Sequence, residues 1–436
     1  MSSQRAPEPR PSGGTRRQFL KTASVASAAA MAGTFAGPAV GAKGANERLG
    51  VGFIGCGGRA GSHMRIVKHL REQRQLPVDH VAFCDVYRPR LERAVKANGG
   101  QGYMDYRDLL RDRNVDLVCI ATPDHHHAQQ TIDAVKAGKD VYCEKPVTHW
   151  RQFDVLKKMV HAVADSGRCV QVGTQGMSDA AWHQMHDLVA DGLIGRPIHA
   201  ECGYFRVGDW GERGMHVDDA SAKAGKDLNW EAFLGDAPAC DFDVSRFFRW
   251  RLYEEYAGGP STDLFPHSLT PVWHVMGLGF PETVVATGGM FRYGEPPRSV
   301  PDTFNALIDV PGKATVAVLG TQGNNDPTNP ARGAGGRIPT IRGWEGSLTV
   351  QGKEILFAPA QGAKGKKPQR IPIAHGENQA DHWQNLIDCV RQGRPGDLNS
   401  PMSLQYGVQT ALIMGMLSLK EGKTARFDPQ KEAILI

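Results

Sequence analysis

The chain has 436 residues, of which 41% are hydrophobic and 22% are charged. This composition excludes a disordered or membrane-embedded protein, and the length suggests two domains. The formal net charge is +5, with part of the excess near the N-terminus at Arg5, Arg10, Arg16, Arg17 and Lys21, so the body of the chain is nearly neutral and no nucleic-acid surface is indicated.

The N-terminal segment has the pattern of an export signal. Residues 15–21 read Thr-Arg-Arg-Gln-Phe-Leu-Lys, a twin-arginine motif, and an Ala-rich run follows over residues 22–36. Small residues up to Ala42 predict cleavage after that position, giving a signal peptide over residues 1–42. We expect export to the periplasm, or beyond it, by the twin-arginine machinery; a disordered tail is the alternative. No stretch reaches the roughly 18 consecutive apolar residues of a membrane span.

Residues 46–172 alternate short apolar runs with helical patterns. The apolar runs predict strands at Leu49–Ile54, Val78–Cys84, Val115–Ala121, Asp140–Cys143 and Val170–Gly173. The segments between them predict helices at Ser62–Leu70, Pro89–Ala97, Asp105–Arg111, His127–Ala137 and Trp150–Ser166. Strands that alternate with helices of this length indicate an α/β fold with a doubly wound parallel sheet, which is a Rossmann domain.

Residues 173–436 have a different pattern of apolar and polar residues, which predicts a second, α+β domain. Helices are expected at Ala181–Asp191, Gln379–Arg391 and Ser403–Leu419. Strands are expected at Ile198–Arg206, Thr283–Met290, Phe304–Val310, Ala314–Leu319, Ser347–Val350 and Glu354–Ala358, with a long loop-rich stretch over 207–257. Strands joined by tight turns predict an open, mostly antiparallel sheet, whose free face favours a homo-oligomer.

A glycine-rich turn follows the first predicted strand. Gly55, Gly57, Gly58, Arg59 and Ala60 belong to a G-x-G-x-x-A pattern that opens a helix. The first glycine permits the tight turn, the second allows close approach of a pyrophosphate, and the small last residue lets helix and strand pack closely. The helix N-terminus offers free N–H groups to the phosphates. The pattern predicts a dinucleotide site, with a structural glycine turn as the alternative.

The second predicted strand ends in Asp85, where an acidic residue contacts the adenosine ribose hydroxyls in such sites. This carboxylate would repel a 2′-phosphate, so NAD is favoured over NADP. Arg88 and Arg90 lie just beyond and weaken that preference.

Chemically capable side chains follow two later strands of the parallel sheet, at residues 122–127 and 144–146. Carboxyl ends of parallel strands form the ligand-binding edge. Lys145 is suited to stabilise negative charge that develops on a substrate oxygen. Asp263 and His267 are four residues apart and share a face if this stretch is helical, so the histidine can accept a proton while the carboxylate orients it. No metal site is expected, because the spaced pair His183 and His186 lacks a third ligand.

The order of these motifs (glycine turn, T-P-x-x-x-H, E-K-P and a later D-x-x-x-H) resembles the glucose–fructose oxidoreductase, inositol dehydrogenase and rhizopine-catabolism family, Gfo/Idh/MocA. The resemblance covers nearly everything after the signal. It implies that Lys145 contacts nicotinamide and substrate, that His267 is the general acid/base and that Asp263 is its polar neighbour. It also implies a set of residues that line the cofactor pocket: Thr122, Pro123, His127, Glu144 and Lys145.

One position departs from the family pattern. Phe265 stands where the family has a glycine, and we expect its bulk to reshape the pocket. Trp250 and Arg251 are candidates for sugar contacts by stacking and hydrogen bonding, with core packing as the alternative for Trp250.

These features favour hydride exchange between a nicotinamide and a secondary alcohol of a sugar, glycoside or cyclitol. A second hypothesis is a glycoside hydrolase or lyase that uses tightly bound NAD for transient oxidation. The retained Lys145 favours the first hypothesis, because the hydrolase relatives replace this lysine. A non-catalytic binding module is a third hypothesis, and it is weakened because the lysine, histidine and aspartate are all present.

Overall fold

The computed structural model describes residues 48–327, 336–374 and 379–436. The predicted twin-arginine signal, residues 1–42, lies outside these ranges. Within them, no helix has the length and apolar character that crossing a bilayer requires.

The first sheet has six strands, all parallel to their neighbours, in the order β3-β2-β1-β4-β5-β6. This is the strand order of a dinucleotide-binding Rossmann sheet. Its strands are β1 (Leu49–Ile54), β2 (Val78–Cys84), β3 (Gln101–Tyr103), β4 (Leu117–Ile120), β5 (Asp140–Cys143) and β6 (Val170–Val172). Every residue of β1, β4 and β5 is buried, because helices cover both faces of the sheet. The predicted α/β fold with a doubly wound parallel sheet is confirmed.

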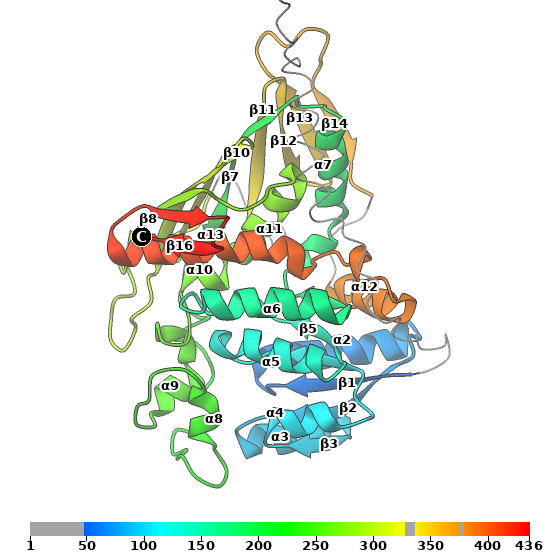
Figure 1. Cartoon of the computed structure of the whole chain (residues 1–436), viewed down its shortest axis with the longest axis vertical. Coiled ribbons are helices and arrows are strands. Elements are labelled where there is room, and N and C mark those ends of the chain that lie inside the picture. The colour runs from blue at the N-terminus through cyan, green and yellow to red at the C-terminus, as the bar shows by residue number, and fades with distance from the viewer. Residues whose placement is uncertain (1–47, 328–335, 375–378) are drawn as a thin grey trace, which may run out of the picture. The chain divides into compact units, whose positions relative to one another are not determined.

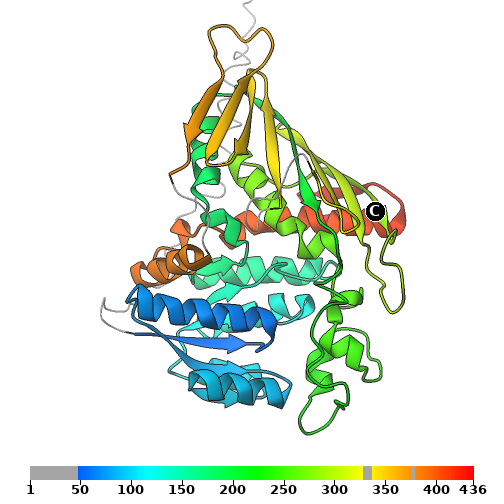
Figure 2. The same ribbon diagram turned by 180° about the vertical axis from the view of Figure 1, so that it is seen from behind.

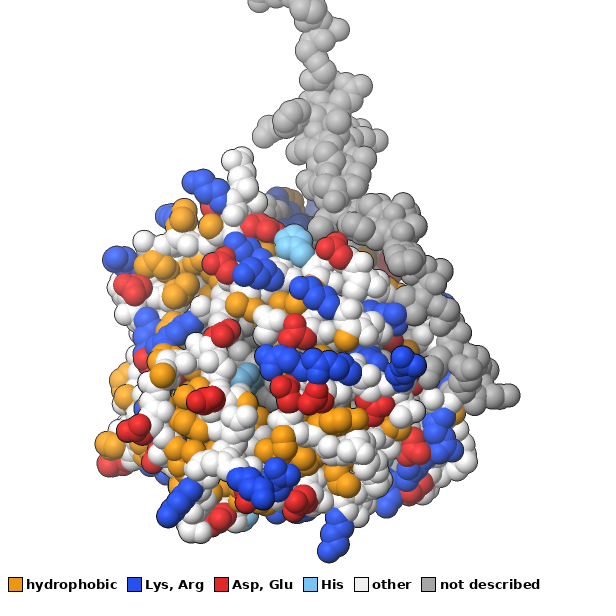
Figure 3. All heavy atoms as spheres, turned by 60° about the horizontal axis from the view of Figure 1, so that its bottom comes forward, with side chains coloured by type: hydrophobic (Ala, Val, Ile, Leu, Met, Phe, Trp, Pro, Cys, Tyr) orange, Lys and Arg blue, Asp and Glu red, His pale blue; other side chains and the backbone are white. Residues whose placement is uncertain are grey.

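Helices connect these strands and form the outer layers. They are α2 (Gly58–Gln73), α3 (Arg88–Asn98), α4 (Tyr106–Arg111), α5 (Asp124–Lys136) and α6 (Phe153–Ser166). Figure 1 shows α5 and α6 on one face of the sheet, and Figure 2 shows α2 on the opposite face. On the face shown in Figure 3, basic and acidic side chains are interspersed.

The second sheet has ten strands in the order β14-β13-β12-β11-β7-β10-β9-β8-β15-β16. They are β7 (Pro197–Phe205), β8 (Thr283–Gly289), β9 (Thr303–Val310), β10 (Ala314–Thr321), β11 (Arg337–Gly343), β12 (Gly346–Gln351), β13 (Glu354–Pro359), β14 (Gln369–Pro372), β15 (Ala425–Asp428) and β16 (Ala433–Leu435). Among the described strand pairs of this second sheet, only β7 and β10 are parallel to each other. The predicted open, mostly antiparallel sheet is confirmed.

Helices cover one face of this second sheet and leave the other open. The covering helices are α7 (Ala180–Ala190), α11 (Phe265–Met276) and α13 (Met402–Glu421). On the open face, Val285 of β8 pairs with Leu307 of β9, and these side chains are 49% and 63% exposed.

A helix from the C-terminal part completes the core of the Rossmann half. In α12 (Gln379–Gln392), Trp383 is fully buried, stacks on Tyr142 of β5 at 4.6 Å and donates its indole N–H to Nδ1 of His63. The contact pairs α12 with α2 across the sequence. The packing therefore crosses the domain boundary predicted at residue 172.

The stretch between β7 and α11 contains only short helices. These are α8 (Trp230–Leu234), α9 (Val244–Phe248), a 3-10 turn at Trp250–Leu252 and α10 (Pro260–Asp263). Further 3-10 turns lie at Gln175–Ser178 and Pro395–Asp397. An aromatic cluster stabilises the stretch, and it includes Tyr87 from the Rossmann half. The prediction of a loop-rich segment over 207–257 is therefore close to the structure.

Candidate active site

The glycine turn between β1 and α2 has the conformation that its sequence predicts. Gly55 has a φ of +85°, and a Cβ there would lie 2.8 Å from the carbonyl oxygen of Ala121, so only glycine fits. Gly57 is the N-cap of α2 and provides no side-chain cap for the first amides. A Cβ at Gly58 would meet nothing within 4 Å. The turn therefore leaves uncapped N–H groups beside open space, which fits a bound pyrophosphate.

Asp85 follows β2 directly and is nearly buried. Its carboxylate accepts hydrogen bonds from the backbone N–H groups of Cys56 and Tyr87, both at 2.8 Å. Burial raises the pKa of Asp85, and the charge of Arg90 opposes this shift. The carboxylate thus ties the glycine turn to the end of β2, and its remaining lone pairs suit ribose hydroxyls.

A cavity of about 820 Å³ runs along this edge of the sheet. Most of the residues predicted for the site line it: Gly55, Gly57, Gly58, Arg59, Asp85, Thr122, Pro123, His127, Glu144, Lys145, Trp250 and Arg251. Ala60, Asp263 and His267 are not part of its wall; Ala60 is buried in α2. Trp250 is 8% exposed and carries the guanidinium of Arg251 4.1 Å above its ring.

Two of the lining side chains, Thr122 and His127, use their polar atoms within the protein. Thr122 donates its hydroxyl to Gln130 at 2.8 Å. The ring nitrogens of His127 lie 2.8 Å from the carbonyl of Thr122 and 2.6 Å from that of Pro146, so this histidine joins the loops after β4 and β5. Such contacts shape the cavity wall.

Glu144, which also lines the cavity, likewise uses a carboxylate oxygen within the protein. Its Oε1 accepts from Arg59 Nε at 2.6 Å and lies 2.8 Å from His63 Nε2. Burial alone would raise the pKa of Glu144, but Arg59 and His63 outweigh it and hold the pKa well below its usual range. This ion pair fixes the end of β5 against the start of α2.

Lys145 and Asp263 are in direct contact. The ammonium donates to both the backbone carbonyl and Oδ1 of Asp263, each at 2.6 Å, and Arg251 Nε lies 3.5 Å from the same Oδ1. Burial would raise the pKa of Asp263, but the charges of Lys145 and Arg251 hold it far below its usual range. The carboxylate is therefore ionised and positions two cations.

His267 lies in the first turn of α11, behind this ion pair. The chain breaks at Leu264 between α10 and α11, so Asp263 and His267 are not on one continuous helix. The expectation that Asp263 orients His267 is not met by the geometry, because within the described residues Nδ1 of His267 has no hydrogen-bond partner. Burial and the charge of Lys145 lower the pKa of His267 to about 3, so its ring is neutral at pH 7.

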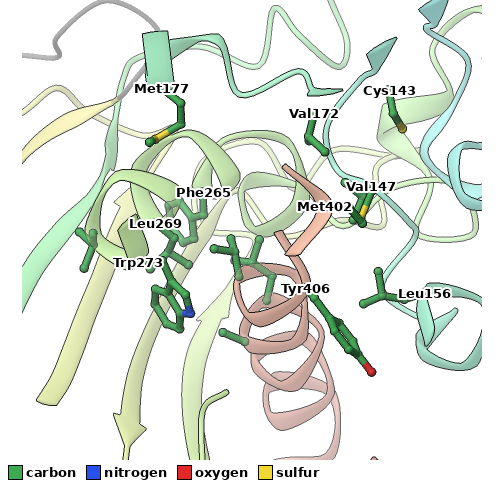
Figure 4. Packing of buried hydrophobic residues seen from close by; sticks show 14 of the residues in the cluster. Cys143, Val147, Leu156, Val172, Met177, Phe265, Leu269, Trp273, Met402 and Tyr406 are labelled. Atoms are coloured by element: carbon green, nitrogen blue, oxygen red, sulfur yellow. The ribbon is translucent and has the colours of Figure 1, made fainter. Parts of the chain in front are cut away.

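Phe265 does not reshape the cavity, contrary to expectation. Its ring is fully buried and packs 5.7 Å from that of Phe304 on β9. A Cβ at Gly320 of β10 would lie 2.6 Å from this ring, so that glycine leaves room for it. Figure 4 shows Phe265, Leu269 and Trp273 along one side of α11 in the core. The bulk is accommodated between helix and sheet.

Two features of the site were not predicted. Asp124, at the start of α5, is 2% exposed and accepts from the Thr262 hydroxyl at 3.2 Å. Burial raises its pKa to about 7, against the charges of Arg251 and Lys145. Its place in the T-P-D-H motif is a signal that sequence reasoning missed. The second feature is segment 207–229, which lines the cavity and carries no motif.

No group of His, Cys, Asp and Glu side chains in the part of the chain that the structure describes has a metal-binding arrangement. His183 and His186 do pack against a third ring, His274, at centroid distances of 4.8 Å. The rings hydrogen-bond to backbone carbonyls of Met177 and His274, which indicates packing.

The Rossmann sheet, the glycine turn and the cavity along its edge define a dinucleotide-binding oxidoreductase fold. Comparison with known proteins agrees: residues 49–174 match the family model described as "Oxidoreductase family, NAD-binding Rossmann fold", GFO_IDH_MocA. This part of the chain is similar to the NAD-binding domain of the Gfo/Idh/MocA oxidoreductases.

Relatives and solved structures extend the similarity beyond that domain. The chain is 29% identical over 263 residues to inositol 2-dehydrogenase of Rubrobacter xylanophilus, covering 58% of this chain and 69% of the relative. It is 27% identical over 345 residues to levoglucosan dehydrogenase of Pseudarthrobacter phenanthrenivorans, covering 71% and 78%. The structure of a levoglucosan dehydrogenase in complex with NADH superposes with a TM-score of 0.63 at 18% identity, covering 87% of this chain and 99% of that one.

Proposed function

We propose that the protein transfers a hydride between NAD and a secondary alcohol of a sugar, glycoside or cyclitol. The observation that carries the proposal is the ammonium of Lys145, which lies on the cavity wall at the end of β5 and is held by Asp263. NAD, when bound, supplies the hydride-accepting ring. The named relatives, which are dehydrogenases of inositol and levoglucosan, support this substrate class.

Two side chains of the protein, Lys145 and His267, have separate proposed roles at the substrate oxygen. Lys145 has three N–H donors and gives two to Asp263, which leaves one for the alcohol oxygen. A fixed ammonium stabilises the negative charge that develops as the hydroxyl proton leaves. His267 is neutral at pH 7 and is the proposed proton acceptor. Because it lies outside the cavity wall, the proposal requires the substrate to extend past Lys145 toward α11.

NAD is the proposed cofactor in preference to NADP. Asp85 is the proposed partner of the ribose hydroxyls, and of the two arginines that follow it Arg90 lines the cavity, where it is paired with Asp218 at 2.9 Å. The uncapped start of α2 would hold the pyrophosphate.

Turnover of purified protein tests the proposal. A panel of sugars and cyclitols with NAD should produce absorbance at 340 nm with at least one member, and Lys145→Ala should abolish it while circular dichroism stays unchanged. Release of phenol from an aryl glycoside without net NADH would indicate the glycosidase instead. Full activity of Lys145→Ala would refute the assigned role. Native mass spectrometry would show whether the dinucleotide stays bound.

We also propose that the protein is exported and that it self-associates through the second sheet. The twin-arginine motif at residues 15–21 supports the first proposal, and processing should stop in an Arg16→Lys/Arg17→Lys variant. The exposed Val285 and Leu307 support the second. Leu307→Asp should lower the molar mass measured by light scattering; an unchanged mass would argue against this interface.

A further inference from the structure

Segment 207–229, between β7 and α8, lies against the Rossmann half at the Asp85 end of the cavity. The backbone N–H of Asn229 donates to the backbone carbonyl of Val86 at 2.9 Å, and the backbone N–H of Arg88 donates to the backbone carbonyl of Asp227 at 2.8 Å. Met215, His216 and Asp218 of this segment line the cavity. Figure 1 shows the green stretch with α8 and α9 beside α3 and α4. The second half of the chain thus contributes side chains to the dinucleotide end of the cavity.

Asp218 binds two arginines of α3 there. Its carboxylate accepts from Arg90 Nε at 3.1 Å and Nη2 at 2.9 Å, and from Arg93 Nη2 at 2.5 Å. The Asp218 and Arg90 side chains are only 10% and 18% exposed. Burial would raise the pKa of Asp218, but the two guanidinium groups lower it to about 2, so it is ionised. All three side chains line the cavity.

Arg90 also faces the dinucleotide turn. A Cβ at Gly57 would lie 3.4 Å from its Nη1, the nitrogen that Asp218 does not use. Its guanidinium lies 5.1 Å from the centre of the Phe248 ring, which fixes its orientation, and its charge acts on Asp85. Arg90 is therefore held beside the glycine turn and Asp85, the residues proposed to bind the pyrophosphate and the adenosine ribose.

We propose that Asp218 is a specificity-determining residue that sets this site for NAD by neutralising Arg90 and Arg93 where a 2′-phosphate would bind. The inference rests on the proposed dinucleotide function and goes beyond it. The ionised Asp218 offsets the positive charge of both guanidinium groups, and the Asp85 carboxyl lies near Arg90, so a phosphate that carries a charge of about −1.5 to −2 finds that positive charge already reduced. The planar guanidinium group of arginine is well suited to bind phosphate, because it can donate two parallel hydrogen bonds to it. Asp218 occupies Nε and Nη2 of Arg90 and Nη2 of Arg93 and so competes with a phosphate for these donors.

The test is the ratio of NADPH to NADH affinity, measured by nicotinamide fluorescence on the full chain. Asp218→Asn keeps the shape and one acceptor but removes the charge, and should shift the ratio toward NADPH about tenfold or more. Asp227→Asn is the matched control: it faces Arg88 from the same segment, is 62% exposed, and should leave the ratio unchanged. Adding Arg90→Met to Asp218→Asn should cancel the gain.

The outcomes separate this proposal from the one it rests on. A wild-type protein that binds neither dinucleotide refutes the proposed function itself. If the wild-type protein binds NADH and Asp218→Asn has the same ratio of NADPH to NADH affinity, the role of Asp218 in specificity is refuted. If the variant binds both dinucleotides equally more weakly, Asp218 only holds segment 207–229 against the Rossmann half. If that variant does not fold, Arg93→Met, at a side chain 63% exposed, should shift the ratio further toward NADH, and no shift would overturn the proposal.

Discussion

Asp124→Asn is the substitution for which the structure gives the clearest quantitative expectation. The carboxyl is 2% exposed, and burial raises its pKa from 3.8 to about 7. Because the pKa is higher in the folded chain than in the unfolded one, the protonated group contributes stability that is complete below pH 4 and is lost as the pH rises to about 7. Asparagine cannot ionise, so the variant escapes this loss while keeping an acceptor for Thr262.

The magnitude follows from the shift. Three pKa units correspond to about 4 kcal/mol in total, and about 2.5 kcal/mol of that falls between pH 5 and pH 8. The difference in free energy of unfolding, variant minus wild type, should therefore grow by about 2.5 kcal/mol over this range.

Urea unfolding at a series of pH values measures this difference, with the same dinucleotide present in both proteins. Asp108→Asn, at an exposed carboxyl on α4, gives the baseline for removing one carboxyl from this chain. A difference for Asp124→Asn that stays constant from pH 5 to pH 8, or that shrinks, would show that the carboxyl is not buried as described and would refute the reasoning.

Three further substitutions test the site and its support. His267→Asn should lower kcat by about 10²–10⁴-fold with little change in dinucleotide binding, measured by steady-state kinetics and NADH titration; an unchanged kcat would remove the histidine from the reaction. Gly320→Ala should cost about 1–3 kcal/mol in urea unfolding, because the new methyl meets both the Phe265 ring and the Tyr204 carbonyl oxygen, and a neutral effect would contradict this close packing. Trp383→Ala should cost about 3–5 kcal/mol and weaken NADH binding, although no residue of α12 lines the cavity; unimpaired stability would contradict the packing of α12.

The parallel sheet could be predicted closely from local patterns. The predicted bounds of β1, β2 and β5 equal those in the structure, because Gly55, Asp85 and Glu144 mark the ends of segments rich in apolar residues. Strand β11 was missed: it contains Pro339 and has irregular register with β7, so it carries no clean alternation. Short strands such as β3 carry too few residues for a period.

The site could be predicted only as far as single motifs reach. The spacing of Asp263 and His267 suggested one helix face, but the break at Leu264 turns the carboxylate toward Lys145 instead. The Arg90–Asp218 contact joins residues 128 positions apart, and no local sequence pattern predicts such a pair. Phe265 can pack in the core because Gly320 leaves room for its ring. Gly320 lies far from Phe265 in the sequence and belongs to no recognised motif, so this packing could not be predicted.

The docking of α12 has a consequence for the order in which the protein can be made. A ribosome completes every strand of the Rossmann sheet by Val172, yet the indole of Trp383 that packs on Tyr142 and His63 is synthesised more than two hundred residues later. Until then, a nascent nucleotide-binding half lacks part of its core and exposes apolar surface to its surroundings. The core of the nucleotide-binding half is thus complete only in the finished polypeptide, and a chain cut short before α12 should be a substrate for chaperones and proteases.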